Sequence, residues 1–289
     1  MWLYYALTFA ICSSLIAIIS KKILGKVGEY FFIWVLRIFT IIFLFLAIIF
    51  LFRIPHTDLI FWVVVTISSI LSALGAYCDY KSIKISEVSL IAPIASFNPV
   101  FTVIISFIFL GENVGVRGII GIMTIVAGAY MLKLSEARKG FFAPIKALFN
   151  NPGVRLALLG SFIWSVEPIL FKVAIFHTVP NVPPFISLVG LVMSVFLFTP
   201  LVFKFSKNDF PKLKKYFWSF LIIGILAAVG EIAGFTAYSL TNLGFAVAVF
   251  RLSMIFTVIL GWIFYKERGI KDKLIGTLVM LVGVVALVI

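Results

Sequence analysis

Charged side chains are scarce in this sequence. Asp, Glu, Lys and Arg together make up 12% of its 289 residues, whereas hydrophobic residues make up 63% and the mean hydropathy is +1.21. Soluble domains carry roughly 25% charged residues, so a chain this apolar has too little polar surface to cover a water-soluble fold. The composition therefore excludes a soluble protein and predicts a membrane protein.

Cysteine and histidine are also rare. The two cysteines, Cys12 and Cys78, lie in apolar runs, where packing explains them better than a disulfide does. His56 and His177 are isolated, so the sequence offers neither a metal-ligand cluster nor a nucleophile–base pair for catalysis. We therefore expect no metal, no cofactor and no enzymatic activity.

Acidic residues are few as well. There are 11 of them against 24 Lys and Arg, which gives a net charge of +13. In a soluble protein this balance would suggest a nucleic-acid partner, but 19 of the basic residues flank alternate apolar runs, where they set membrane orientation. We therefore expect no nucleic-acid partner, cytoplasmic odd-numbered loops, and both termini outside.

Long apolar runs account for most of the chain. A spanning helix needs about 20 apolar residues, and ten runs come close to this length. They are 2–20, 30–52, 59–80, 86–109, 116–134, 155–176, 184–204, 217–239, 245–264 and 271–288. Strands are excluded because the runs are too long and do not alternate polar with apolar residues. The predicted fold class is an all-α membrane protein with ten transmembrane helices.

One stretch of the chain occurs twice. Residues 101–128 and 256–283 are identical at ten of 28 positions, including a Glu and two glycines in register. This predicts two repeats of five helices each, 1–134 and 155–289, joined by a cytoplasmic linker at 135–154 with an amphipathic surface segment. Because five is odd, the second repeat enters the membrane inverted relative to the first.

The duplicated motifs resemble a known family. Residues 85–112 read ISEVSLIAPIASFNPVFTVIISFIFLGE, and the second half begins with SFIWSVEPILFK. The set is similar to the EamA-type transporters of the drug/metabolite transporter superfamily, and the resemblance implies secondary transport of small organic solutes, often export of amino acids or related metabolites. The sequence departs from that pattern at Tyr265-Lys266-Glu267, where the family tends to have Gly-Glu. We interpret Glu112 and Glu267 as structural carboxylates that complement the start of the helix following each.

Five ionisable side chains lie deep within the apolar runs, where each costs about 2.5–3.5 kcal/mol on insertion scales and is a functional candidate. They are Arg37, Glu167, Lys172, Glu231 and Arg251. Glu231 and Arg251 each lie about ten residues from the turn between their helices, hence roughly 15 Å from the outer surface. They form either a substrate or proton site, in which Arg251 clamps a carboxylate, or an ion pair that pins two helices together.

The other ionisable side chains within the apolar runs have different expected roles. Pro168 follows Glu167 in mid-helix, where it would kink the helix and free backbone carbonyls beside a desolvated carboxylate suited to reversible protonation. Lys172 either joins this site or extends to the outer surface. Arg37 is expected to extend to the cytoplasmic interface, and Asp79 to serve there as a cap or anchor.

Polar and aromatic residues complete the predicted site. Pro93 and Pro99 loosen the fourth helix around Ser96 and Asn98, which form either a pocket wall or a hinge. Trp164 and Tyr238 would line an amphipathic cavity, with lipid-facing packing as the alternative.

The combination of acidic and basic groups at mid-membrane favours one function over others. We expect an alternating-access carrier in the plasma membrane, a monomer or homodimer, that moves an amino acid or related metabolite, by export. It works either by coupling to protons or by exchange. The alternatives are a multidrug exporter of lipophilic cations, against which Arg251 counts, and a nucleotide-sugar or lipid-linked substrate translocator.

Overall fold

α-Helices form nearly all of the described chain. The structure, a computed structural model, describes residues 1–51, 54–94, 97–98, 100–101, 105, 116–132, 143–180, 182–240, 249–267 and 269–288. The helices of the first half are α1 (Trp2–Leu24), α2 (Glu29–Leu51), α3 (Leu59–Ile85), α4 (Val88–Ile94) and α6 (Val116–Met131). Those that follow are α7 (Ala143–Asn150), α8 (Pro152–Phe176), α9 (Pro183–Phe205), the 3-10 helix η2 (Lys207–Asp209), α10 (Lys212–Leu240), α12 (Leu252–Tyr265) and α13 (Ile270–Val288).

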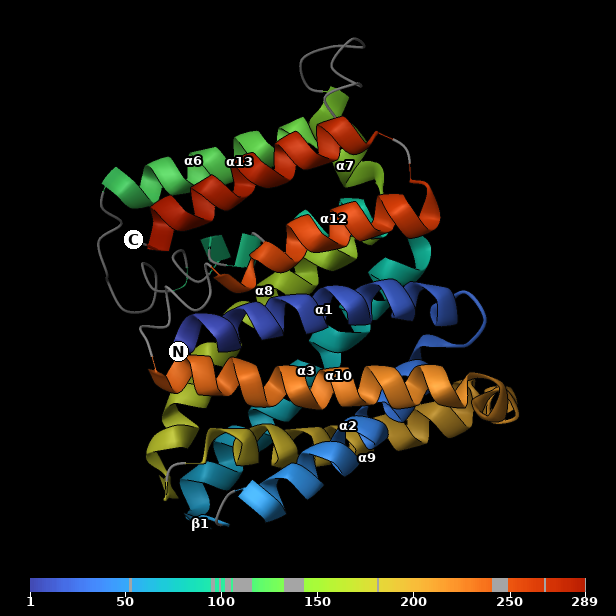
Figure 1. Cartoon of the computed structure of the whole chain (residues 1–289), viewed down its shortest axis with the longest axis vertical. Coiled ribbons are helices and arrows are strands. Elements are labelled where there is room, and N and C mark those ends of the chain that lie inside the picture. Colours follow the sequence, from blue (N-terminus) through green and yellow to red (C-terminus); the bar gives the residue numbers. More distant parts are fainter. Residues whose placement is uncertain are drawn as a thin grey trace.

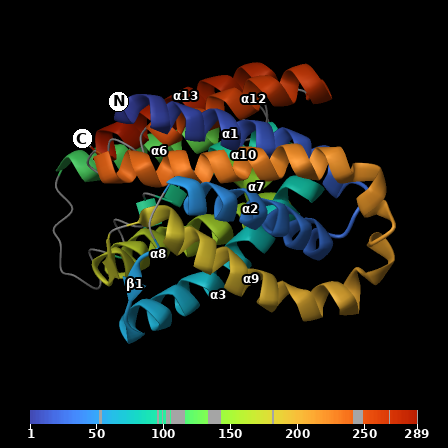
Figure 2. The same cartoon turned by 60° about the horizontal axis from the view of Figure 1, so that its bottom comes forward.

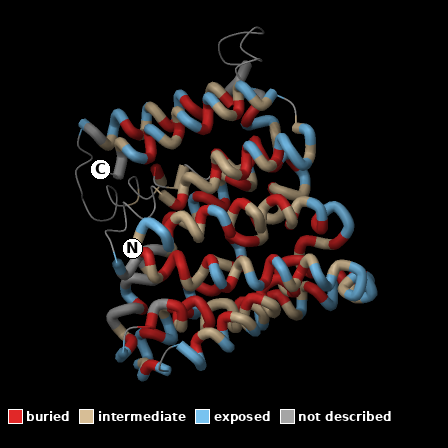
Figure 3. Tube along the Cα trace, viewed as in Figure 1, coloured by how far each residue is buried: buried red, intermediate tan, exposed pale blue. Residues whose placement is uncertain are grey.

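The membrane class predicted from composition is confirmed. Within the described residues, five helices are long and apolar enough to cross a membrane, namely Trp2–Leu24, Glu29–Leu51, Leu59–Ile85, Pro184–Phe205 and Lys212–Ala237. Large apolar side chains on their outer faces are exposed, for example Phe50 and Trp218, and exposed positions alternate with buried ones along the helices in Figure 3. An apolar outer surface of this kind suits contact with lipid.

Two groups of helices pack along each other's length. In one group α1 lies along α10 and contacts α12, and in the other α3 lies along α8, which contacts α4. Helices α2 and α9 pack together on one side of these groups, and α6 and α13 on the other (Figures 1 and 2). The largest buried apolar cluster joins α1, α2 and α3 to α9 and α10, with Phe31, Phe32 and Phe220 fully enclosed.

The glycines shared by the two matching stretches bring α6 and α13 into backbone contact. A Cβ atom at Gly276 would lie 2.7 Å from the carbonyl oxygen of Gly128, and one at Gly283 would lie 2.9 Å from that of Gly121. Small residues allow such close approach, which is how helices gain packing contacts in a membrane. The duplicated glycines are therefore required by one helix–helix interface.

The two ends of the bundle differ. Both chain termini and the strand β1 lie at one end, on the left of Figure 1, which we call the strand end. The opposite end, which we call the lysine-rich end, carries the connections after α1, α3, α9 and α12, with Lys21, Lys84, Lys212 and Lys266. The structure places several of these basic residues in the first or last turn of helices rather than in loops, because α1 and α3 extend further than the apolar runs did.

The prediction that strands are absent is wrong in one detail. β1 (His56–Thr57) pairs antiparallel with β2 (Thr178–Val179), with His56 opposite Val179 and Thr57 opposite Thr178. The pair is two residues long and lies in connections, so it is too short for hydropathy periodicity to detect. It ties the connection after α2 to the connection after α8.

The connection between the halves is helical in part. Helix α7 lies within the predicted linker 135–154, while residues 133–142 lie outside the described residues. Helix α8 continues across Pro168. A surface position for α7 on the membrane stays a prediction.

Candidate functional site

A cavity of about 170 Å³ lies between α2, α3, α8, α9 and α10. Its walls combine charged, polar and apolar side chains: Ile33, Leu36, Arg37, Thr40, Ser72, Ala76, Asp79, Tyr80, Trp164, Leu191, Ala227 and Glu231. A cavity of about 150 Å³ in a protein core holds a molecule the size of benzene. The present cavity therefore accommodates a small solute and offers it groups of both charges.

Arg37 is the basic group of the cavity. Its side chain is buried, and Nη2 donates hydrogen bonds to the carbonyl oxygen of Ser72 at 2.9 Å and to the Ser72 hydroxyl at 3.3 Å. The guanidinium lies 5.5 Å from the ring centre of Phe198, while Nη1 is buried and has no hydrogen-bond partner in the described part of the chain. The expectation that Arg37 extends to the interface is wrong, because the residue lies two turns inside α2 on the face that packs against α3.

Glu231 on α10 is the first of two carboxylates that line the cavity. It accepts a hydrogen bond of 2.7 Å from the hydroxyl of Ser187 on α9. The charge of Arg37 is close enough to interact with that of Glu231. Glu231 thus shares the cavity lining with Arg37, while Arg251, with which it was expected to form either a site or an ion pair, is not among the residues that line the cavity.

Asp79 on α3 is the second carboxylate. It accepts a hydrogen bond of 2.7 Å from the indole Nε1 of Trp164 on α8. Two glycines make room for this contact: a Cβ at Gly75 would lie 2.8 Å from the Trp164 ring, and one at Gly160 would lie 2.6 Å from Asp79 Oδ1. Asp79 is therefore part of the cavity wall rather than the interfacial anchor expected for it. Trp164 lines the cavity, and a role for it in binding stays a prediction.

Arg251 belongs to a neighbouring polar network. Its Nη2 donates to Oδ1 of Asn98 at 3.1 Å, and Nδ2 of Asn98 donates to the carbonyl oxygen of Ser161 on α8 at 3.1 Å. Arg251 precedes α12, and its charge is close enough to interact with Asp79. The network therefore joins α12 to α8 beside the cavity without lining it.

The remaining predicted site residues are placed less directly. Glu167 is half-buried on α8, outside the cavity lining, yet close enough to interact electrostatically with Glu231, Arg37 and Asp79. Lys172 and Tyr238 lie on α8 and α10, but their side chains lie outside the described residues, as do Ser96 and Glu112 entirely.

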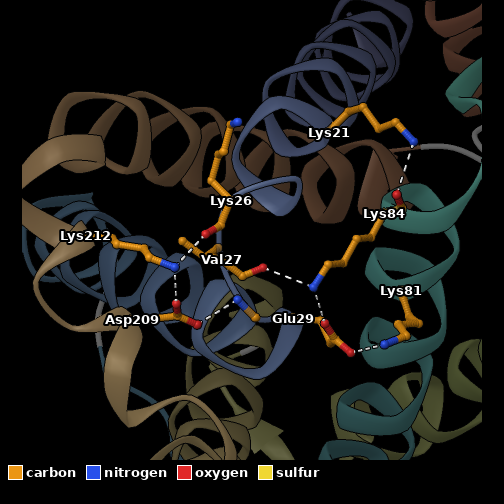
Figure 4. A network of polar contacts seen from close by, with 9 residues as sticks. Lys21, Lys26, Val27, Glu29, Lys81, Lys84, Asp209 and Lys212 are labelled. Carbon is orange, nitrogen blue, oxygen red and sulfur yellow. Dashed lines mark hydrogen bonds and ion pairs between the residues drawn. The ribbon is translucent and has the colours of Figure 1, made fainter.

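At the lysine-rich end, ion pairs within each half of the chain are linked by hydrogen bonds between the halves (Figure 4). The carboxylate of Glu29, the first residue of α2, forms ion pairs with Lys84, whose Nζ lies 2.8 Å from Oε2, and with Lys81. Asp209 accepts from the backbone amide of Gly28 at 2.7 Å and from Lys212 at 2.7 Å. Lys84 and Lys212 reach further to the carbonyl oxygens of the α1–α2 connection.

At the strand end, Asp58 bridges two connections. It accepts a hydrogen bond from the backbone amide of Phe61 at 2.9 Å, as the N-cap of α3, and lies 2.6 Å from Nδ1 of His177. The hydrogen bond from Phe61 and the contact with His177 lower the pKa of Asp58 below its usual value. The Asp58–His177 contact lies next to the β1–β2 pair.

Sequence reasoning did not assign Asp79 and Tyr80 to the site, and it directed Arg37, one of its five deep candidates, to the interface instead of the cavity. For α3 the signal was available in helical spacing: Ala76 follows Ser72 by four residues, and Asp79 and Tyr80 follow Ala76 by three and four, which places all of them on one face of α3. A polar stripe on an otherwise apolar membrane helix indicates a face turned toward a cavity.

Comparison with known proteins gives consistent results. The model of the EamA-like transporter family matches residues 1–134 and 151–289. An uncharacterized transporter of Archaeoglobus fulgidus is 24% identical over 228 residues, which are 78% of this chain and 76% of that protein. An uncharacterized protein of Methanocaldococcus jannaschii is 31% identical over 70 residues, 24% of this chain and 51% of that protein. A crystal structure with 15% identity has a TM-score of 0.65 and covers 99% of this chain and 95% of its own, a likeness of fold alone.

Proposed function

Because the chain belongs to the EamA-like transporter family, a family of membrane transporters, we propose that the cavity between α2, α3, α8, α9 and α10 is its substrate site. The observation that carries this proposal is Arg37. Its Nη1 donors are buried without a partner in the described residues, and the cavity beside them also contains the carboxylates of Asp79 and Glu231. Groups of opposite charge around one small cavity favour a zwitterion, such as an amino acid or related metabolite.

Arg37 would bind the carboxylate of that solute. A buried guanidinium with unsatisfied donors carries a desolvation cost that an anionic ligand offsets. Nη1 supplies the hydrogen bond to the carboxylate, and the two bonds from Nη2 to Ser72 hold the planar group in a fixed orientation. This is the role that the sequence analysis gave to Arg251.

Glu231 and Asp79 would bind the amine. Among the described residues each carboxylate accepts one side-chain hydrogen bond, Glu231 from Ser187 and Asp79 from Trp164, which leaves acceptor capacity for an ammonium group. The volume of about 170 Å³ limits the solute to a small one in this conformation. Glu167, close to the same charges, would take up or release the coupling proton.

Transport would follow from alternating access between two inverted five-helix repeats, with ten spanning helices in all. Helix contacts support this because they occur in matching pairs. In the order of the chain, α1, α2, α3 and α6 of the first repeat correspond to α8, α9, α10 and α13 of the second. Exchanging the repeats therefore turns the α1–α10 contact into the α8–α3 contact, and the α2–α10 contact into the α9–α3 contact, and all four contacts are present. The contacts α2–α9 and α6–α13 correspond to themselves, as expected on a two-fold axis in the membrane plane. We further propose export across the plasma membrane, with the lysine-rich end cytoplasmic and the termini outside.

A multidrug exporter of lipophilic cations is the second candidate. The carboxylates Asp79 and Glu231 together with the aromatic rings of Trp164 and Tyr80 favour it, since rings and acids attract organic cations. The two functions differ in Arg37, which a cation carrier has no need to bury in its cavity.

Binding to the purified protein distinguishes these functions. We would measure the affinity of small amino acids, organic acids and quaternary ammonium compounds by calorimetry, in wild type and in Glu231→Gln. Amino acids that bind wild type and lose affinity in the variant would support the zwitterion site. Binding of lipophilic cations alone would favour the multidrug function, and amino-acid affinity unchanged in Glu231→Gln would contradict the assignment of this cavity.

A further inference from the structure

The junction between α3 and α4 is held from outside by residues of α1 and of the α12–α13 connection. We propose that these contacts, made by Lys21, Glu267, Glu87 and Lys273, are the gate that closes the lysine-rich end of the transport pathway. We call this set the clasp. The inference rests on the proposed substrate cavity and adds to it the contacts that must break for the solute to leave at this end.

Lys21 binds the end of α3. Its Nζ donates to the carbonyl oxygens of Ile83 at 2.5 Å and Lys84 at 3.4 Å, and also to that of Ser86. The last carbonyls of a helix have no partners within the helix, so a lysine amine satisfies them well. Figure 4 shows the Lys21 side chain extending from α1 to the Lys84 carbonyl. One lysine thus fixes α1 to α3 at this end.

Glu267 binds the start of α4. Its carboxylate accepts hydrogen bonds from the backbone amides of Val88 and Ser89, both at 3.0 Å, and from the Ser89 hydroxyl. The sequence analysis expected Glu267 to complement the helix that follows it, α13, and this is wrong. The folded chain brings the α12–α13 connection to the α4 terminus instead, so the carboxylate joins the two halves of the protein.

A buried lysine completes the clasp. Lys273 on α13 is 2% exposed, and its Nζ lies 2.6 Å from Glu87 and 3.6 Å from Glu267. Burial of an ammonium group is costly unless carboxylates surround it. The Lys273 charge therefore depends on the α3–α4 junction staying in contact with α13.

The clasp connects α1 and the α12–α13 connection to the α3–α4 junction, near the end of α3 that follows the cavity residues Asp79 and Tyr80. Lys21 and Glu267 belong to the side of α1 and α12, and their partners belong to α3 and α4. The cavity takes Glu231 from α10 on the first side and Asp79 from α3 on the second. If the groups rock apart at the lysine-rich end to release a solute, the bonds of Lys21 and Glu267 must break first.

Membrane orientation does not explain why acidic residues lie at the lysine-rich end. Lysines collect there under the positive-inside rule, but Asp and Glu contribute little to orientation. Glu87 and Glu267 nevertheless lie in the clasp, and Glu29 binds Lys84 beside it. Carboxylates placed to bind lysines across helix groups fit a reversible closure.

A larger pocket lies directly outside the clasp. It measures about 630 Å³ and is lined by Lys21, Glu87, Asn151, Lys266 and Glu267 among others. Charges of both signs in its wall suit the same zwitterionic solute as the inner cavity. We assign it as the vestibule that connects the pathway to the solution once the clasp is open.

Distance measurements between spin labels test the gate. Labels at Lys22→Cys on α1 and Lys146→Cys on α7 report the separation of the two sides, because both positions are exposed at this end. On this background, Lys21→Met should increase the population with longer distances by roughly tenfold, since it removes several charge-assisted hydrogen bonds. The matched control is Lys26→Met, which should change nothing. Lys26 is an exposed lysine five residues after Lys21, and its side chain makes no hydrogen bond or ion pair in the described part of the chain.

A second variant covers the case in which Lys21→Met does not fold. Glu87→Gln alters a half-exposed carboxylate of the same clasp and should shift the distances in the same direction. Distances that stay unchanged in every folded variant would overturn the gate. If the wild-type protein binds no amino acid, the substrate cavity is contradicted while the distance measurements still stand. The failure of the gate and the failure of the substrate site are therefore distinguishable.

Discussion

Arg37 offers the sharpest test of the substrate cavity. We consider the change Arg37→Met, which keeps an unbranched apolar stem and removes the guanidinium. The variant should fold, because replacing a buried charge with an apolar side chain of similar volume relieves desolvation. The Ser72 carbonyl that loses its Arg37 partner lies inside α3, where a helical hydrogen bond also satisfies it.

The size of the effect follows from the donors that face the cavity. Nη2 already serves Ser72, so Nη1 supplies the bond to a bound carboxylate. A hydrogen bond to a charged group contributes about 1.5–3 kcal/mol. Its loss should weaken the binding of an amino acid by about 10- to 150-fold. Arg37→Lys retains the charge without the planar fork and should lose less.

The assay compares two solutes in each variant. Calorimetry on the purified protein would measure an amino acid and the primary amine obtained by removing its carboxyl group. Arg37→Met should weaken the binding of the amino acid and leave the binding of the amine unchanged. Equal affinities for the amino acid in wild type and in a folded, monodisperse Arg37→Met protein would refute the reasoning.

Three further changes probe other parts of the structure. Arg251→Ala removes the bond to Asn98 beside the cavity and should lower amino-acid affinity less than Arg37→Met does; a larger loss in calorimetry would return the carboxylate site to Arg251. Gly276→Leu would force a side chain against the Gly128 backbone and should lower the free energy of unfolding by about 1–3 kcal/mol, which lowers the melting temperature by several degrees. An unchanged melting curve would contradict the close α6–α13 contact. The pKa of Asp58 is lowered in the folded protein, so its contribution to stability is present above about pH 4 and is lost as the pH falls through the lowered value. Asp58→Asn should remove that part of the acid dependence of the melting temperature, and identical pH profiles would count against the bridge at the strand end.

The membrane class could be predicted from residues alone because it depends on composition and run length. A bilayer requires long apolar helices whatever their neighbours are, so the runs located α1, α2, α3, α9 and α10 within a few residues. The family followed from the duplicated motif by the same one-dimensional logic. The Glu and glycines that marked the duplication also have structural roles, at the α4 terminus and in the α6–α13 contact.

The site was harder to predict, because it depends on which helix faces meet. Depth along a helix favoured Glu231 with Arg251, since both lie at a similar distance from one turn. Depth does not determine azimuth: the structure turns Glu231 toward Arg37 in the cavity, and Arg251 toward Asn98. Arg37 was expected to reach an interface because of its position near one end of its apolar run, yet packing of α2 against α3 encloses it.

The sequence by itself determined that this chain lies in a membrane, consists of helices and carries an internal duplication, because each of these follows from the order of residues along one dimension. The tertiary structure decided which charges share a cavity and which residues hold the two halves together. The physical reason is that burial and hydrogen bonding act across helices far apart in the chain, as between Lys21 and Ile83 or Glu267 and Ser89.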